Sequence, residues 1–569
     1  MSMLSLLWVT FLASVALADA PYDTVREALR RGEPVAADFD ALLQAEDRIA
    51  RDGLLTGTPD ERRARLAPLE ASTSRIVSAH LQHAADDRDL ADLALRTLIR
   101  RKGQLIDAEY ATRQAVRDTA DADGKKLLTE LTRATRRLDS LVRRTSTPPG
   151  KLREARKAVN DLQRALAEAS RPYRAVASFV GTAEVASTLD RRGLLVEFAV
   201  FRPWDLAADT FGPPHYAVYT LDRTGTVLGA DLGPVAPIDE SVRRLRGTLN
   251  GQRDLGPMAD DLRSRLFGDL PWVGRTPRLA IAPDGLLSHV PFELVLADAN
   301  DGEFKVPRVT YLTSGRELPF LGVWDAEVSE GVLVFDVDYG PGRPWGPLPG
   351  TRDEGESIME VAPNARVLRG TEATEAAILD LVRPRFLHVA SHGFFLAETD
   401  PARFSSFEEG SRGLLVAPAA PRPVLEAEAT GETDHPALRS GIVFAGANQG
   451  EGIVTAAEWS NLDLRGTRFV VMSACESGLG EIRNGDGVHG LRRALVLAGT
   501  QAQVLSLWRV DDAATALLIQ RMYERLAAGA NVGDALHAAR MSLAREGRFR
   551  HPRFWAAFTV SGRSVVRVR

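Results

Sequence analysis

Cysteine is almost absent from this chain, because Cys475 is the only one among 569 residues. One thiol excludes an internal disulfide framework and any zinc site built from several cysteines. A basic excess is also missing: 71 Lys and Arg stand against 76 Asp and Glu, which gives a net charge of −5. A general nucleic-acid binder carries the opposite balance, so we expect no nucleic-acid partner.

Long apolar stretches are missing outside the N-terminus, where one run extends from Met3 to Ala18. This run is too short for a comfortable transmembrane helix. It ends in Ala16-Leu-Ala18, a small-residue cleavage pattern, so residues 1–18 are predicted to be the signal peptide of a secreted or periplasmic protein. The absence of Lys or Arg before the run leaves open an uncleaved anchor, or a start codon placed too early in a cytoplasmic protein. No membrane span is expected beyond this segment.

Residues 19–185 are rich in Ala, Leu, Arg, Asp and Glu and are expected to be helical. Pro148-Pro149-Gly150 separates two segments in which apolar residues recur at three- and four-residue spacing, which predicts an antiparallel, coiled-coil-like hairpin. The apolar residues are Leu128, Leu131, Ala134, Leu138 and Leu141, then Leu152, Ala155, Val159, Leu162, Leu166 and Ala169. We find no 34-residue tetratricopeptide period. Two interpretations stay open: an arm that binds a protein activator, or a brace packed on the next domain.

From Gly193 onward, apolar strand patterns alternate with helical ones, which predicts an α/β fold with a mostly parallel sheet covered by helices on both faces. We divide it into residues 193–325 and residues 330–569. In the first part, His289 and Glu293 could imitate a catalytic pair. No candidate nucleophile is near them in sequence, so we expect both to be structural.

Two apolar runs of the second part end in reactive side chains: Phe469-Val-Val-Met-Ser-Ala-Cys-Glu-Ser-Gly-Leu-Gly480 and Phe386-Leu-His-Val-Ala-Ser-His-Gly393. Open α/β sheets bind their ligands at the carboxyl ends of the strands. Cys475 and His392 are therefore predicted to be a thiol nucleophile and its base. The N–H groups of Gly393 and Cys475 are the expected oxyanion donors.

Asp511 and Asp512 follow a third apolar run, Ala502-Gln-Val-Leu-Ser-Leu-Trp508, and are expected at the same edge of the sheet. They form either a solvated turn or the floor of a pocket for a Lys or Arg side chain.

Two other sites are suggested by spacing and then rejected. His388 and His392 are four residues apart on a strand, about 13 Å, too far to share one metal ion, so His388 is expected to be a core residue. Gly485-Asp-Gly-Val-His-Gly490 spells a dinucleotide fingerprint, but it begins some ten residues after the strand ends. We expect these glycines to pass close to the site and to start a helix at Val488. No metal and no cofactor is predicted.

These residues lie in motifs that strongly resemble the CHAT domain, a caspase- and separase-like cysteine peptidase domain of clan CD. The resemblance extends from about Leu194 to the C-terminus. The motifs are Ala390-Ser-His-Gly393, Ser473-Ala-Cys-Glu-Ser-Gly478, Ser506-Leu-Trp-Arg-Val-Asp-Asp-Ala-Ala-Thr515, Ile281-Ala-Pro-Asp-Gly-Leu-Leu-Ser-His-Val-Pro-Phe292 and Leu348-Pro-Gly-Thr-Arg-Asp-Glu354. The resemblance to the CHAT domain implies a caspase-like fold whose first half, Leu194–Val323, is degenerate and whose second half is active.

The resemblance also assigns roles to single residues. It implies that His392 is the general base, Cys475 the nucleophile and Gly393 part of the oxyanion hole. The loop of Trp508 would line the substrate pocket, with Ser473 on the pocket side. Asp512 matches the position that holds a basic P1 residue in separase-like members.

The chain departs from familiar CHAT proteins in three respects. Its helical region is too short for a tetratricopeptide array, it is expected to be exported, and a helix rather than a cleavable linker fills the interval between Cys475 and Ser506. The leading hypothesis is a cysteine endopeptidase that cleaves protein substrates after Lys or Arg. The alternative is a latent or scaffold-type CHAT protein that acts by partner binding through its helical region.

Overall fold

The computed structural model describes most of the chain, with gaps at residues whose positions are not described. The described residues are 19–118, 122–143, 147–170, 180–249, 254–268, 270, 273, 276–297, 305–320, 327–342, 344–395, 436–474, 477–483, 485 and 487–567. The predicted signal peptide, residues 1–18, and the predicted nucleophile Cys475 lie outside them. In the part that is described, no helix has both the length and the apolar character needed to cross a membrane.

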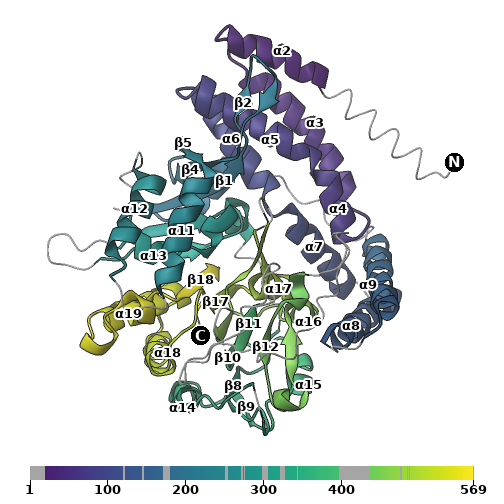
Figure 1. The fold of residues 1–569 in the computed structure, drawn as a ribbon, viewed down its shortest axis with the longest axis vertical. Coiled ribbons are helices and arrows are strands. Elements are labelled where there is room, and N and C mark those ends of the chain that lie inside the picture. Colours follow the sequence, from purple (N-terminus) through teal and green to yellow (C-terminus); the bar gives the residue numbers. More distant parts are fainter. Residues whose placement is uncertain are drawn as a thin grey trace.

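Helices make up the first part of the described chain and lie along one side of the molecule (Figure 1). They are α2 (Asp19–Arg30), α3 (Ala36–Leu54), α4 (Pro59–Leu66), α5 (Pro68–Ser78), α6 (Arg88–Arg101), α7 (Gln104–Asp118), α8 (Ala122–Arg143), α9 (Pro149–Ser170) and α10 (Thr182–Thr188). Helices α8 and α9 pack together as a hairpin, with Leu131 and Leu138 buried against Val159 and Leu166. The periodic apolar residues of both segments thus face each other.

One sheet of eleven described strands runs through the rest of the molecule, in the order β5-β4-β1-β6-β7-β18-β17-β14-β10-β8-β9. The strands are β1 (Gly193–Phe201), β4 (His215–Asp222), β5 (Val227–Pro234), β6 (Arg278–Ala282), β7 (Arg308–Tyr311), β8 (Val332–Val337), β9 (Arg366–Gly370), β10 (Phe386–Ala390), β14 (Phe469–Ser473), β17 (Ala502–Ser506) and β18 (Phe558–Gly562). Neighbours are antiparallel at β5-β4, β4-β1 and β18-β17 and parallel elsewhere. The predicted fold class, a mostly parallel sheet between helices with a helical region before it, is confirmed.

Helices cover both faces of this sheet because side chains alternate along each strand. Val196 and Phe198 of β1 point into the core under one set of helices, whereas Leu195 and Ala199 point to the opposite face. The first set contains α11 (Val235–Leu249), α12 (Gly256–Phe267), α14 (Gly350–Val361), α18 (Asp512–Ala527) and α19 (Val532–Ala544). The opposite face is covered by the N-terminal helical region and, beyond it, by α15 (Glu375–Leu379), α16 (Ala456–Trp459) and α17 (Leu491–Ala498). The helical region therefore shares the core of the α/β part.

Smaller sheets surround the edge where β10 and β14 end. Strands β11 (Gly393–Phe395), β12 (Ser440–Val443) and β13 (Ile453–Thr455) form one, and β15 (Gly480–Arg483) pairs with β16 (Gly487–Gly490) as a hairpin. A two-stranded ribbon, β2 (Trp204–Asp205) and β3 (Thr210–Phe211), lies apart from both.

The helix predicted to start at Val488 instead starts at Leu491, so that prediction was wrong. Gly490 is extended, and a Cβ there would come 2.6 Å from the carbonyl oxygen of Leu479 in the hairpin. Cross-strand pairing, together with the poor helix propensity of glycine, keeps this segment extended.

Candidate active site

The candidate active site lies at the edge of the sheet where two neighbouring parallel strands, β10 and β14, end; every residue of both strands is buried. Their register pairs Ala390 with Ser473. In sequence, His392 and Cys475 each come two residues after this pair. Parallel pairing thus brings the end of the histidine strand beside the segment that leads to the cysteine.

His392 lies at the point where the chain leaves β10 and enters β11, and its side chain is buried. Its ring is flanked by those of Tyr339 and Trp345, with centroids 4.9 and 5.3 Å away. Nε2 is 2.8 Å from the carbonyl oxygen of Gly346. A carbonyl oxygen can only accept a hydrogen bond, so in the neutral ring Nε2 carries the proton and Nδ1 is the basic nitrogen. This hydrogen bond to a backbone carbonyl fixes the tautomer and the orientation of the ring.

Asn448 holds the segment that carries this carbonyl. Its Oδ1 accepts from the N–H of Trp345 at 2.9 Å, and its Nδ2 donates to the carbonyl oxygens of Gly340 and Trp345 at 2.9 and 3.0 Å. Sequence reasoning missed Asn448 and Gly346. The only local signal was an asparagine between two glycines, Gly446 and Gly450, which marks a turn but no partner.

The residues on either side of Cys475 and Glu476 are bonded to the end of β17. Ser506 donates from Oγ to the carbonyl oxygen of Ala474 at 2.5 Å, and its own carbonyl oxygen accepts from the N–H of Gly478 at 2.7 Å. Its N–H donates to Oγ of Ser477 at 3.0 Å. A single serine therefore fixes the chain before and after the predicted nucleophile. Ser506 lies in a recognisable sequence motif, but the motif does not predict these contacts.

The predicted pocket residues are all described, and each has structural contacts. Trp508 is buried and donates from its indole nitrogen to the carbonyl oxygen of Arg553 at 3.0 Å. Asp511 caps α18 by accepting from the N–H of Ala514 at 2.9 Å. Asp512 is buried, and its carboxylate accepts from the N–H of Gly350 at 2.6 Å, at the start of α14.

The other two predicted site residues lie beside the histidine and cysteine. Ser473 is the buried last residue of β14, and Gly393 is the buried first residue of β11, opposite Ile442. Asp512 is connected to the histidine through the short segment from Gly346 to Gly350, so one loop contacts both side chains.

His388 and Glu293 are both buried in the core, as expected, and each has partners of its own. His388 Nε2 is 2.9 Å from Glu354, and both side chains are fully buried. Glu293 accepts from the hydroxyl of Tyr311 at 2.6 Å and pairs with Arg540 at 3.1 Å. Neither residue reaches the candidate site through these contacts.

His289 is buried too, and burial together with the nearby Arg246 lowers its pKa to about 3. It is neutral at physiological pH. Among the described residues, no group of three or more His, Cys, Asp or Glu is placed to hold a metal ion.

Comparison with known proteins gives one family match. The family model of the CHAT domain matches residues 257–563. Tetratricopeptide repeat protein 28 of Mus musculus is 26% identical over 321 residues, which are 52% of this chain and 12% of that protein. The chain thus spans about an eighth of the length of this curated relative.

Two solved structures resemble the chain at low identity. The Saccharomyces cerevisiae separase–securin complex matches with a TM-score of 0.41 at 9% identity. The match covers 96% of this chain and 40% of the chain in that structure. Gingipain R, an Arg-specific cysteine proteinase of Porphyromonas gingivalis, has a TM-score of 0.32 at 9% identity, with coverage of 55% and 68%. Both TM-scores are below 0.5, so these likenesses say nothing about the activity of this chain.

Proposed function

Because this chain belongs to the CHAT domain family, we propose that it is a cysteine endopeptidase in which Cys475 and His392 hydrolyse peptide bonds of protein substrates. The observation that carries this proposal is the parallel pairing of β10 with β14, in the register that joins Ala390 to Ser473. It supports a juxtaposition of the histidine with the cysteine at one edge of the sheet.

The reaction proceeds through an acyl-enzyme. His392 takes the thiol proton of Cys475 on Nδ1, and the thiolate attacks the scissile carbonyl carbon. The N–H groups of Gly393 and Cys475 stabilise the oxyanion. The C–N bond then breaks, and the imidazolium gives its proton to the leaving amine. Water attacks the thioester with His392 as base, which releases the carboxylic acid product and restores the thiol.

The bond from Nε2 of His392 to Gly346 supports this role. It fixes the ring orientation and presents the basic nitrogen on the opposite side. Burial between Tyr339 and Trp345 adds to this preorganisation, because a ring held in place loses no rotational freedom in the reaction.

Cleavage after Lys or Arg is the proposed specificity, with Asp512 as the acidic group beneath the P1 side chain and Asp511, Trp508 and Ser473 around it. A carboxylate gives bidentate binding to Arg. Asp512 is also the partner of the Gly350 amide, so a purely structural role is the competing explanation.

The test uses Arg-, Lys- and Asp-P1 aminomethylcoumarin peptides with purified protein and with Cys475→Ala. Hydrolysis that is abolished by Cys475→Ala and is faster on Arg or Lys than on Asp supports both proposals. Hydrolysis that survives the substitution overturns the mechanism. Equal rates on Arg-P1 and Asp-P1 peptides overturn the role of Asp512.

A second candidate function is a latent CHAT protein that acts by partner binding through the helical region. The α8–α9 hairpin favours it, because α8 and α9 have highly charged outer residues and sit at the side of the molecule (Figure 1). Under this alternative the purified chain is inactive, yet Cys475 still reacts with a peptidyl electrophile once a partner protein is added. Full activity of the purified chain by itself would reject it.

A further inference from the structure

The turn between α6 and α7, Lys102 and Gly103, projects from the helical region into the α/β part. Lys102 is buried, and its Nζ is 2.6 Å from Glu197, which is fully buried in β1. Nζ also donates to the carbonyl oxygens of Phe198 and Ala282 at 2.7 and 3.1 Å. A buried charge of this kind requires good pairing and saturated hydrogen bonding, so the turn is held in one position.

Gly485 is bound from two sides at the place where this turn ends. Its carbonyl oxygen accepts from the N–H of Gly103 at 2.7 Å. Its own N–H donates to Oδ1 of Asp284 at 2.9 Å. Asp284 is buried, and its other oxygen accepts from the N–H of Val200 at 2.9 Å, which fixes the carboxylate to β1. One residue of the second half is therefore clamped by the helical region and by the first half.

Gly485 belongs to the turn of the β15–β16 hairpin, and this hairpin leads directly to the predicted nucleophile. The register pairs Gly480 with Gly490 and Arg483 with Gly487. Gly480 is five residues after Cys475 in the sequence. The paired strands connect the Gly485 turn to Gly480, so we expect a displacement of the turn to reach the chain next to the cysteine.

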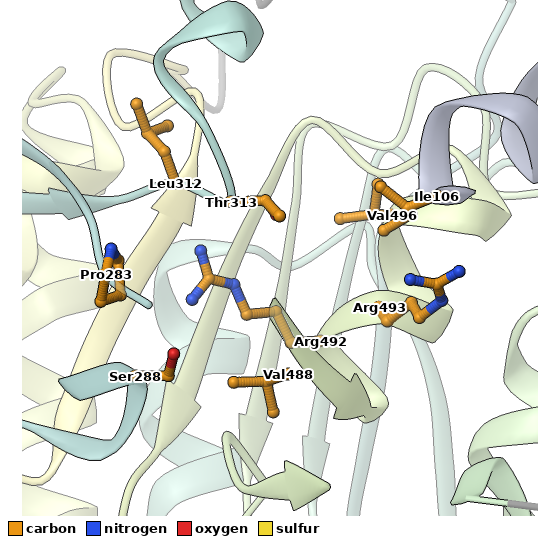
Figure 2. Close-up of a pocket in the computed structure, with 9 residues that line it drawn as sticks. All are labelled: Ile106, Pro283, Ser288, Leu312, Thr313, Val488, Arg492, Arg493 and Val496. Atoms are coloured by element: carbon orange, nitrogen blue, oxygen red, sulfur yellow. The ribbon is translucent and has the colours of Figure 1, made fainter. Parts of the chain in front are cut away.

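Asp284 and the Lys102–Gly103 turn together form a clamp on Gly485, and the surroundings of this clamp are closely packed. A cavity of about 10 Å³, room for a single water molecule, is lined by residues from all three parts of the chain (Figure 2). Ile106 comes from α7, Pro283 and Thr313 from the first half, and Val488 and Arg492 from β16 and α17. The hairpin thus packs against both other parts.

We propose that Asp284 and the Lys102–Gly103 turn are positioning groups for Cys475. By holding Gly485 they fix the hairpin, and with it the segment that follows the nucleophile, while Ser506 fixes the same segment from β17. The helical region then has a direct part in forming the active site. This inference rests on the proposed function, since it concerns the same nucleophile.

Two substitutions test the clamp. Asp284→Ala removes the acceptor for the N–H of Gly485. Gly485→Ala strains the turn, because Gly485 has φ +72°, a conformation that disfavours any side chain, while no atom lies within 4 Å of the added Cβ. The matched control is Asp222→Ala, which also removes a carboxylate bound to backbone N–H groups, those of Thr224 and Thr226, in the turn between β4 and β5.

The first readout is the rate of Cys475 alkylation by iodoacetamide across pH, which needs no substrate and reports one site because the chain has one thiol. The second is kcat and KM on the Arg-P1 peptide. Both clamp variants are expected to lower kcat by about tenfold or more with KM changed less than about twofold, because misplacement of a reacting group acts on the chemical step. The alkylation midpoint is expected to move toward the free-thiol pKa of about 8.5. Asp222→Ala leaves both unchanged.

The outcomes separate this inference from the proposed function. If Asp284→Ala does not fold, the alkylation profile and kcat of Gly485→Ala alone test the positioning role. Folded clamp variants with the alkylation profile and kcat of the unchanged protein overturn the positioning role. If the unchanged protein hydrolyses no peptide, the proposed function fails, and the alkylation profile still decides whether the clamp positions Cys475.

Discussion

Removal of the Asn448 side chain is the sharpest test of how the candidate histidine is oriented. Asn448→Ala deletes three hydrogen bonds of 2.9, 2.9 and 3.0 Å, which join Asn448 to Gly340 and Trp345. None of the three bonds involves His392 or Cys475. The backbone bond from the N–H of Asn448 to the carbonyl oxygen of Tyr339 remains. The substitution therefore frees the carbonyl that accepts from His392 while the local turn persists.

The magnitude follows from these bonds. Each contributes a net ~1 kcal/mol, so about 2–3 kcal/mol of the preference for the observed loop position is lost. That corresponds to roughly a 30- to 150-fold change in the equilibrium between aligned and displaced loop. A displaced carbonyl leaves the ring free to rotate or to change tautomer. We expect kcat to fall by about tenfold to a hundredfold with little change in KM, because orientation of the base acts on the chemical step.

The assay is hydrolysis of the Arg-P1 peptide, with thermal unfolding measured in parallel. Asn531→Ala is the matched control: Asn531 caps α19, accepting from the N–H of Asp534 at 2.8 Å, and α19 packs on β7 and β18. Its loss costs about 1 kcal/mol of stability and leaves kcat unchanged. The reasoning is refuted if Asn448→Ala keeps the kcat of the unchanged protein although its unfolding temperature has dropped.

Three further predictions concern stability. Lys102→Met leaves Glu197 buried without its cation and should lower the free energy of unfolding by about 3–5 kcal/mol. The double variant with Glu197→Leu should recover most of this loss. A double variant as unstable as the single one in thermal unfolding would contradict this prediction. Burial and the nearby Arg246 lower the pKa of His289 to about 3 in the folded protein. As the pH falls below about 6.5, the histidine is therefore protonated in the unfolded chain before it is protonated in the folded one. The stability present above that pH is lost progressively toward pH 3. In urea unfolding between pH 6 and 5, His289→Gln should flatten the dependence by about 1 kcal/mol per pH unit, and an unchanged slope would reject the assignment. Leu138→Ala should cost about 2–5 kcal/mol and expose α8 to trypsin, with partly buried Leu128→Ala as the milder control.

Strand ends were predictable because the signals are local. An apolar run followed by a turn residue identified β10 and β14, and the difference between a mid-strand and a strand-end histidine separated His388 from His392. The structure agrees for His388, which is enclosed by Glu354 and Tyr523. The conformation of Val488 was less predictable: a helix was expected to start there, but the residue is extended because it pairs with Ile482 across the hairpin.

The partners of the candidate site could not be predicted, because a backbone carbonyl carries no sequence signature. Gly346 is 46 residues before His392, and its oxygen becomes the acceptor only when the loop after β8 folds over the end of β10. Ser506 is 32 residues from Ala474, and its two-sided contact depends on β17 pairing with β14.

The sequence by itself determined that this chain has one thiol, placed just beyond a buried strand, and a histidine in the same position beyond another. Those facts depend on composition and on short continuous apolar runs that end in turn residues, and they hold in any fold that forms the strands. Only the tertiary structure decided that the two strands are neighbours in parallel register. It also decided that the helical region reaches the second half, where Gly103 binds Gly485 across 382 positions of sequence. Such contacts arise from the joint burial of segments far apart in the chain, and no local pattern encodes them.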